Sequence, residues 1–390
     1  MEKFKEFIPY GRQQISQEDI REVTKVLKSN FLTQGPEVPL FEETIARYVG
    51  AKFCTVANSA TSALHLSCLA LGISKNDLVW TSPISYVATA NAAIYCGAKV
   101  EFIDIEEDNF NISPNHLEAQ LIKAKKANKL PKAVIVVHMC GQSASMKSIY
   151  QLSKKYHFHI IEDASHAIGG EYLSKKIGSC QYSDLCVFSF HPVKIITTGE
   201  GGAITTNNQE LENKLKRLVS HGVTRLKDDF ENQDDGPWYY EQTDLGYNYR
   251  MTEIQAALGR SQFTKLDSFV NKRNIIAKDY YDILNSLPLD MPQVNKDCYS
   301  SFHLFVIRLE KGLEHLRKKV FNDLLDNGFG VNVHYIPIYR QPFHRKALKK
   351  GFSLEAAEDY YSRAISIPIY PALNRKDQVR LGEVIKKSLS

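Results

Sequence analysis

The chain has 390 residues, of which 43% are hydrophobic and 24% are charged, and its formal net charge is +5. This composition is ordinary for a globular enzyme, and the weak, dispersed positive charge favours an anionic small molecule over nucleic acid as the ligand. The N-terminal stretch has no apolar signal-like segment, and no apolar run approaches membrane-spanning length, so we expect a cytoplasmic protein with no membrane contact. The seven cysteines include no CxxC pair, which predicts reduced thiols and no metal site.

The first elements expected along the chain are helices. Ser16 and Asp19 form a helix-start signal, and helical spacing of apolar residues continues towards Asn30. A second helix is predicted around residues 40–49. A third should begin at the small polar residues Asn58–Ser59 and run to Gly72.

Short apolar runs that indicate buried strands then alternate with helical patterns at residues 114–127 and 146–156. The expected strands are residues 78–80, 99–105, 133–138, 159–163 and 185–190. Continuous apolar strands alternating with helices predict an α/β fold, with a mostly parallel sheet covered by helices on both faces.

The pattern changes near Thr252, where one long helix is predicted. A smaller α/β region should follow, with strands at 302–309 and 330–335 and a final helix. We therefore expect two domains, a large ligand-binding domain of residues 1–262 and a small C-terminal domain of residues 263–390.

Polar groups stand at the predicted carboxyl ends of two strands, where ligands gather in such sheets. Asp163 ends one strand, with His166 just beyond, and Ser189 ends another, with Lys194 shortly after. The Asn58–Thr61 turn precedes a helix and suits a phosphate group. A lysine, a carboxylate and a phosphate cradle together suggest pyridoxal 5′-phosphate, which needs an amine for its aldehyde and an acid for its ring nitrogen.

Each of these residues has a common role without a ligand. Lys194 could be a loop lysine, Asp163 and the Asn58–Thr61 turn could be helix caps, and His166 could be a structural histidine. Their joint arrangement on one sheet edge is what favours the cofactor.

Several segments resemble the DegT-type nucleotide-sugar aminotransferases, which are fold-type-I enzymes dependent on pyridoxal phosphate. The similarity extends along nearly the whole chain. It is carried by NSATSALHL at 58–66, TSPISYVATAN at 81–91, EDASHAIGG at 162–170, FSFHPVKIITTGEGG at 188–202 and LGYNYRMTEIQAALG at 245–259.

The resemblance implies catalytic roles for three residues. Lys194 matches the lysine that forms a Schiff base with the cofactor, Asp163 the partner of the ring nitrogen, and His166 the group near the ring hydroxyl. The other implied cofactor-binding residues are Ala60, Thr61, Tyr86, Ser189 and Asn248. Asn248 matches a residue supplied by the neighbouring subunit, so a homodimer with a shared site is implied. Ala60 stands where the family commonly has glycine.

Softer segments (IPYGRQQIS, SNFLTQGP, GPWYYE and NVHYIPIY) point to one branch of the family. That branch transfers an amino group from L-glutamate to C4 of UDP-2-acetamido-2,6-dideoxy-β-L-arabino-hex-4-ulose, a step of pseudaminic acid biosynthesis. The implied substrate-binding residues are Tyr10, Asn30, Phe31, Leu32, Thr33, Ser59, Ala60, Ser189, Asn248, Asn332, Val333, His334 and Tyr335.

Alternatives stay open at this point. The acceptor could be another keto nucleotide sugar, aminated at C4 or C3 and carrying UDP, dTDP or GDP, or the chain could be an inactive regulator of the same fold. The sequence alone does not fix the C5 configuration of the sugar or the uridine-binding residues. Arg250 could bind the donor carboxylate or form a structural salt bridge.

Overall fold

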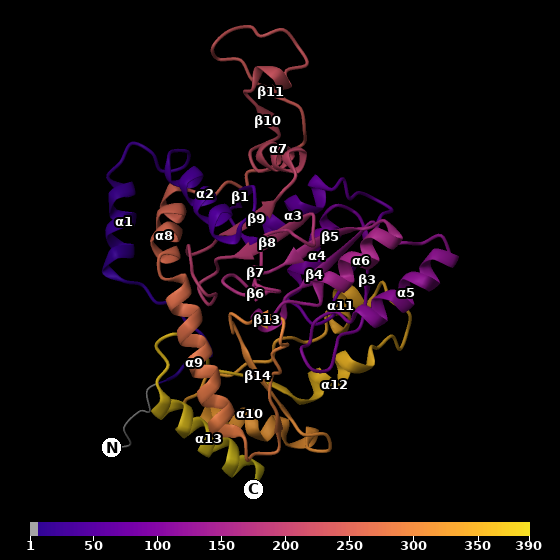
Figure 1. The fold of residues 1–390 in the computed structure, drawn as a ribbon, viewed down its shortest axis with the longest axis vertical. Coiled ribbons are helices and arrows are strands. Elements are labelled where there is room, and N and C mark those ends of the chain that lie inside the picture. The colour runs from indigo at the N-terminus through magenta and orange to yellow at the C-terminus, as the bar shows by residue number, and fades with distance from the viewer. Residues whose placement is uncertain (1–6) are drawn as a thin grey trace.

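The computed structural model describes residues 7–390. A central sheet lies between layers of helices, and a smaller C-terminal layer packs below it, as Figure 1 shows. Within the described residues, no helix combines the length and the apolar character needed to cross a membrane.

The central sheet has seven strands in the order β1-β9-β8-β5-β4-β2-β3. Only β9 runs antiparallel to its neighbours, which confirms the prediction of a mostly parallel sheet. The strands are β1 (Phe53–Ala57), β2 (Leu78–Thr81), β3 (Lys99–Phe102), β4 (Ala133–Val137), β5 (His159–Asp163), β8 (Leu185–Ser189) and β9 (Gly202–Thr206).

Both faces of this sheet are apolar because alternate residues of each strand point to opposite sides. In β4, Ala133 and Ile135 join one core cluster, whereas Val134 and Val136 join another. The helices that pack on the sheet are α2 (Glu37–Val49), α3 (Ala60–Ala70), α4 (Ala88–Tyr95), α5 (Pro114–Lys126), α6 (Met146–Tyr156) and α7 (Gln209–Leu218).

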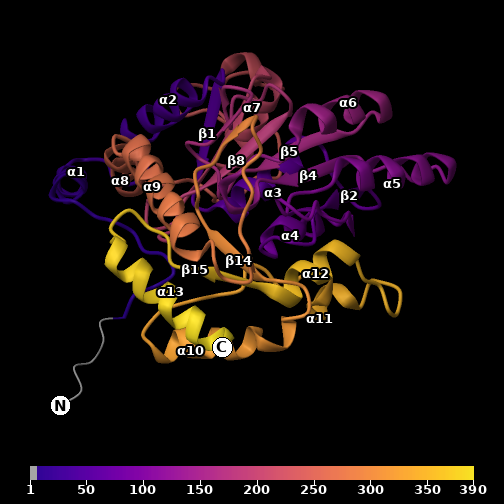
Figure 2. The ribbon, with the colours of Figure 1, turned by 60° about the horizontal axis from the view of Figure 1, so that its bottom comes forward.

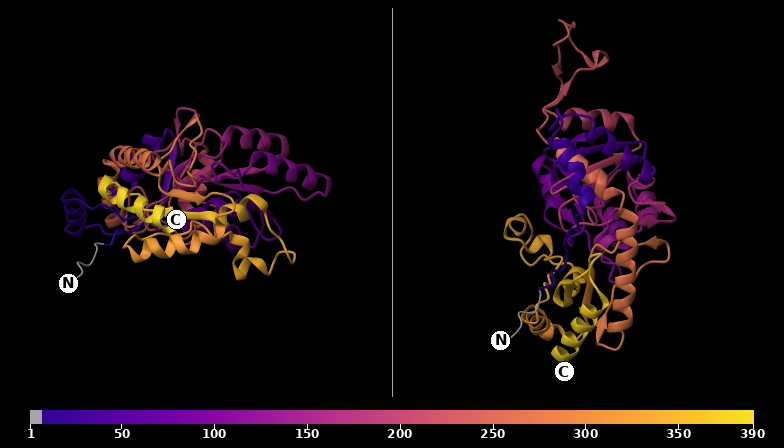
Figure 3. Two further views of the ribbon diagram at one scale, coloured as in Figure 1. Left: turned by 90° about the horizontal axis from the view of Figure 1, so that it is seen from below. Right: turned by 90° about the vertical axis from the view of Figure 1, so that its left-hand side faces the viewer.

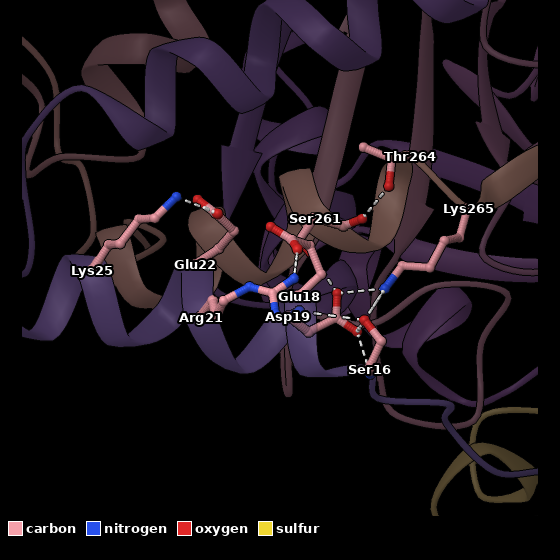
Figure 4. Close-up of polar contacts among 9 residues, drawn as sticks. All are labelled: Ser16, Glu18, Asp19, Arg21, Glu22, Lys25, Ser261, Thr264 and Lys265. Atoms are coloured by element: carbon pink, nitrogen blue, oxygen red, sulfur yellow. Dashed lines mark hydrogen bonds and ion pairs between the residues drawn. The ribbon is translucent and has the colours of Figure 1, made fainter.

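Helix α1 (Gln17–Leu27) is fastened to the neighbouring helix α8 (Glu253–Phe263) by a buried carboxylate. Asp19 accepts hydrogen bonds from Ser261 Oγ at 2.6 Å and from Lys265 Nζ at 2.7 Å (Figure 4). Ser16 caps the helix, as its sequence predicted, and its backbone N–H also donates to Asp19. The residues that start α1 therefore also hold α1 against α8 and the start of α9, an arrangement we call the Asp19 clamp.

The single long helix predicted from Thr252 is wrong. The chain forms α8 and then α9 (Leu266–Leu284), with a break at Thr264 and Lys265. The Thr264 hydroxyl donates to the Ser261 carbonyl at 2.7 Å, an i−3 bond that competes with the regular helical pattern. The predicted domain border at residue 262 falls at the end of α8.

A three-stranded antiparallel sheet forms the core of the C-terminal region. Its strands are β12 (Leu289–Asp290), β14 (Phe305–Leu309) and β15 (Ala364–Ile367). Two helices, α10 (Arg317–Asp326) and α13 (Arg375–Leu389), cover it (Figure 2). Ile8 pairs with Phe329 and is buried in the same core, so the N-terminal segment packs with the C-terminal region.

The strand predicted at 330–335 is also wrong, because only Asn332 pairs, through an isolated bridge to Ser366. The Gly330 N–H is already bonded to the Ile8 carbonyl, so it is not free for a sheet ladder. The strand predicted at 302–309 begins only at Phe305. The shorter elements of this half are α11 (Pro342–Arg345), α12 (Glu355–Arg363) and β13 (Cys298–Tyr299). Strand β13 pairs with β6 (Glu171–Tyr172) of the first half, and β6 also pairs with β7 (Lys175–Lys176).

A narrow arm projects from the body at the end opposite the C-terminal layer (Figures 1 and 3). Its base is the two-stranded pair β10 (Val223–Thr224) and β11 (Glu241–Gln242). The arm and its base leave four apolar or aromatic side chains at least half exposed: Leu226, Trp238, Tyr240 and Leu245.

Candidate active site

The polar residues predicted at strand ends meet at one edge of the central sheet. Asp163 is the last residue of β5 and Ser189 the last of the adjacent parallel strand β8. The third segment is the N-terminus of α3, which follows β1. Strand β1 runs in the same direction as β8 and is separated from it by β9. The sheet therefore gathers three of the predicted site segments, as expected for ligand sites of α/β proteins.

Asp163 is a buried carboxylate whose two oxygens are both hydrogen-bonded. Thr89 Oγ1 donates to Oδ2 at 2.7 Å, and Ser165 donates to Oδ1 from its hydroxyl at 2.6 Å. These donors hold the carboxylate in a fixed orientation. An orientated buried carboxylate needs a positive or hydrogen-donating partner, such as a protonated ring nitrogen.

Lys194 lies in the turn after β8, five residues beyond the end of the strand, where its backbone N–H bonds the His191 carbonyl at 2.9 Å. Burial of its amine lowers the Lys194 pKa to about 8, although the negative charge of Asp163 acts in the opposite direction. A lysine with this pKa holds a substantial neutral fraction just above neutral pH. It can act as a nucleophile and as a proton acceptor.

His166 connects this edge to the C-terminal region. Its Nε2 lies 3.1 Å from the Tyr335 hydroxyl, and the two rings are stacked at 21°. Burial is the main reason that the His166 pKa is held well below its usual range, with the charge of Lys194 adding to it. His166 is therefore a neutral imidazole. Its Nδ1 is buried without a hydrogen-bond partner among the described residues, and so it is available to a ligand.

His303 is a site residue that the sequence did not reveal. It lies just before β14, with its ring centroid 4.4 Å from that of His166. The only signal was one histidine inside the apolar run FHLFV, which is equally typical of a structural histidine.

The N-terminus of α3, where an anion site was predicted, is capped by its own side chain. Ser59 is its N-cap, and its side chain and carbonyl accept from the N–H groups of Ser62 and Ala63. The N–H groups of Ala60 and Thr61 are left for a ligand, since first-turn donors have no intrahelical partner. Gly202 packs against this turn so closely that a Cβ there would lie 2.7 Å from the Ala60 nitrogen.

Several residues predicted to contact the substrate or the cofactor also gather beside the histidines. The rings of Tyr10 and His334 lie 5.1 Å apart, and His334 Nδ1 lies 2.8 Å from Ser366 Oγ. The Tyr86 ring is 61% exposed and lies 6.2 Å from the Tyr335 ring, at the open side of the cluster.

Other predicted residues lie elsewhere in the single chain. The loop of Asn30, Phe31, Leu32 and Thr33 is exposed and is held to α8, where the Leu32 carbonyl accepts from the Glu253 N–H. Asn248 is also exposed, and its carbonyl accepts from the Asn58 side chain at 3.5 Å. Val333 is half-buried and directly precedes His334. The substrate roles of these residues stay predictions.

Arg250 donates to Ser220 Oγ at 3.0 Å. It forms no salt bridge with any residue in the range 7–390, so the structural salt bridge considered for it is absent there.

The residues at this edge fit pyridoxal phosphate. They provide an amine with a lowered pKa at Lys194, an orientated carboxylate at Asp163 and a buried, unpartnered imidazole nitrogen at His166. The first-turn N–H groups of α3 could accept a phosphate, as helix N-termini do.

Comparison with known proteins gives concordant matches. The sequence matches the DegT/DnrJ/EryC1/StrS aminotransferase family over residues 13–386. It is 43% identical over 371 residues to the UDP-4-amino-4,6-dideoxy-N-acetyl-beta-L-altrosamine transaminase of Campylobacter jejuni, covering 95% of this chain and 94% of that protein. It is 37% identical to the Bacillus subtilis spore coat polysaccharide biosynthesis protein SpsC, covering 99% and 98% of the two chains.

Solved structures agree with these matches. Helicobacter pylori PseC, described as an aminotransferase involved in the biosynthesis of pseudoaminic acid, superposes with a TM-score of 0.89 at 34% identity, covering 98% of this chain and 99% of that one. The PLP form of a sugar aminotransferase from Streptococcus pneumoniae superposes with a TM-score of 0.87 at 25% identity, covering 98% and 100%.

Proposed function

Since this chain belongs to the DegT/DnrJ/EryC1/StrS aminotransferase family, we propose that it is a pyridoxal-phosphate-dependent transaminase of a UDP-linked keto sugar. The amino group passes from L-glutamate to C4 of UDP-2-acetamido-2,6-dideoxy-β-L-arabino-hex-4-ulose. The observation that carries the chemistry is the convergence of Lys194, Asp163 and His166 at one sheet edge. The observation that supports this particular sugar is the 43% identity to the Campylobacter transaminase over most of the chain.

Pyridoxal phosphate supplies an electron sink for the carbon that gains or loses a proton. In this proposal Asp163 pairs with the protonated ring nitrogen, and the free Nδ1 of His166 faces the ring hydroxyl. The backbone N–H groups of Ala60 and Thr61 and the Ser189 hydroxyl would hold the phosphate. Tyr86, exposed at the open side of the cluster, would be available to stack on the cofactor ring.

Lys194 is the group that bonds the cofactor and moves the protons. Its amine takes a proton from the α-carbon of glutamate and, in the second half of the reaction, delivers one to C4 of the sugar. A pKa of about 8 suits both directions, because the amine and the ammonium are then both populated near physiological pH.

We also propose that the working unit is a homodimer. The exposed apolar side chains of the arm and of the Asn30–Thr33 loop suit a protein interface better than water. Asn248 and this loop are exposed in the single chain and would then serve the partner's site.

A coupled assay tests the proposed substrate. Purified protein is given L-glutamate and either the β-L-arabino or the D-xylo epimer of the UDP-linked 4-keto-6-deoxy sugar, and 2-oxoglutarate release is followed. Strong preference for the L-arabino epimer is expected. Preference for the D-xylo epimer would keep the chemistry and change the sugar, and no release with either would reject this substrate class.

A further inference from the structure

The amine of Lys194 has a single side-chain partner within hydrogen-bonding distance among residues 7–390. That partner is His303, whose Nε2 lies 3.5 Å from Lys194 Nζ. The separation is at the long end of hydrogen bonding, and such contacts often tighten when a site is occupied. The two residues are 109 positions apart in the sequence. Lys194 lies at the edge of the central sheet, and His303 lies in the C-terminal region.

The backbone around His303 is fixed by a buried arginine. Arg273 is 1% exposed, and its Nη1 donates to the carbonyls of Phe302 and His303, each at 3.2 Å, and of Ile369 at 2.9 Å. On the other side, Ser301 Oγ donates to the His166 carbonyl at 2.8 Å. The His303 ring is thus attached to a pinned segment, as expected of a residue that must hold another group in place.

Burial and the positive charges around His303 keep its ring neutral. Its pKa is held well below the usual range, first by burial and then by the positive charges of Lys194 and Arg273 and by neighbouring His166 and His334. A neutral imidazole has one donor and one acceptor nitrogen. Nδ1 of His303 is buried without a hydrogen-bond partner in the described chain. Lys194 is therefore the only described residue within hydrogen-bonding distance of the His303 ring nitrogens.

We propose that His303 is a positioning residue for Lys194, and that its Nε2 accepts a hydrogen bond from the lysine amine whenever that amine is not bonded to the cofactor. The proposal rests on the transaminase function. In each turnover Lys194 must be released and later return, and its long side chain loses several rotamers when it is held. An acceptor at a fixed place keeps the released amine beside the reacting carbon.

The direction in which the Lys194 pKa changes when His303 is replaced tests this role. An acceptor stabilises the ammonium form, so replacing His303 with leucine should lower the Lys194 pKa by about one pH unit, since a hydrogen bond to a charged group is lost. The Lys194 pKa is read from the pH dependence of trace acetylation of Lys194, located by mass spectrometry, in full-length protein freed of cofactor. The His303→Gln variant, which keeps an acceptor oxygen, should remain near the wild-type value. His344→Gln, which removes a buried histidine that packs on Phe102, is the control.

A Lys194 pKa that is unchanged or raised in His303→Leu would overturn the proposal. Loss of a merely structural histidine would leave the Lys194 pKa unchanged. Loss of a histidine that donates to the neutral amine would raise the Lys194 pKa. If His303→Leu does not fold, ¹⁵N-labelled histidines in the wild-type protein give the same decision. A neutral ring with its proton on Nδ1, shifting as Lys194 titrates and not in Lys194→Met, is expected, and its absence rejects the role. Failure of the proposed function would differ, because the wild-type protein would then bind no cofactor, or would bind it and release no 2-oxoglutarate in the coupled assay.

Discussion

The Tyr335 hydroxyl lies 3.1 Å from Nε2 of His166, joining two segments that are 169 residues apart in the sequence. Because His166 is neutral, a hydroxyl that donates to Nε2 leaves the imidazole proton on Nδ1, the nitrogen that has no other described partner. One contact between the two halves of the chain therefore sets what His166 can donate to a ligand.

Replacing Tyr335 with phenylalanine should lower kcat/KM by about tenfold, because the tautomer and orientation of His166 are no longer fixed by that hydrogen bond. The absorbance maximum of the bound cofactor should shift as well, since the donor at its ring hydroxyl changes. Tyr339→Phe is the control, because its hydroxyl bonds Glu358 instead. An unchanged spectrum and unchanged kinetics in Tyr335→Phe would rule out this role.

The burial of Lys194 should reduce the stability of the cofactor-free protein. The folded-state pKa of about 8 is below the ordinary value of 10.5, so folding costs free energy whenever the unfolded lysine is charged, and the full cost applies below about pH 8. Lys194→Met should raise the free energy of unfolding by about 2 to 3 kcal/mol at pH 7. The gain should shrink as pH rises from 8 and vanish above about 10.5. Urea unfolding at several pH values measures it, and equal stability at pH 7 would contradict it.

Asp19 should be a major stabilising residue although it is far from the chemistry. Burial alone would raise its pKa, but hydrogen bonds from Lys265, Ser261 and Ser16 outweigh burial and lower it. Its contribution is therefore present above the ordinary aspartate pKa and is lost as pH falls through the lowered value. Asp19→Asn should cost about 2 to 3 kcal/mol at pH 7 in urea unfolding.

The control for Asp19→Asn is Glu22→Gln on the same helix, which breaks only the surface pair with Lys25 (Figure 4). It should change stability by less than about 0.5 kcal/mol. A loss as large as that of Asp19→Asn would mean that α1 depends on surface charge rather than on the Asp19 clamp.

A shared active site predicts complementation between two inactive variants. Lys194→Ala and Asn248→Ala homodimers, unfolded together and refolded, should regain about a quarter of the wild-type activity, since half the dimers are mixed and each carries one intact site. Each variant refolded alone is the control. If the mixture stays inactive although mixed dimers form, Asn248 acts within its own chain.

Residues whose role depends on local sequence were predictable, and those that depend on distant contacts were not. The strand ends at Asp163 and Ser189 and the cap at Ser59 carry their own signals, since apolar runs and small polar caps act over a few residues. The break at Thr264 was not predictable, because it accompanies a hydrogen bond and the Asp19 clamp, neither of which helical periodicity contains.

The same distinction applies to the C-terminal half. Residues 330–335 have strand-like alternation, yet the Gly330 N–H is used by Ile8 and only Asn332 joins the sheet. The histidine in the apolar run around residue 303 could not be told from a structural one in the sequence, because its partner Lys194 is 109 residues away. Tertiary contacts override local patterns at these positions.

The most direct test of the central claim is borohydride reduction of the protein with pyridoxal phosphate, followed by peptide mass spectrometry. We predict one phosphopyridoxyl adduct, on the peptide that contains Lys194, and its loss when L-glutamate is added before reduction because the lysine is then released. An adduct on another lysine, or none, would contradict the assignment of Lys194 as the residue that bonds the cofactor.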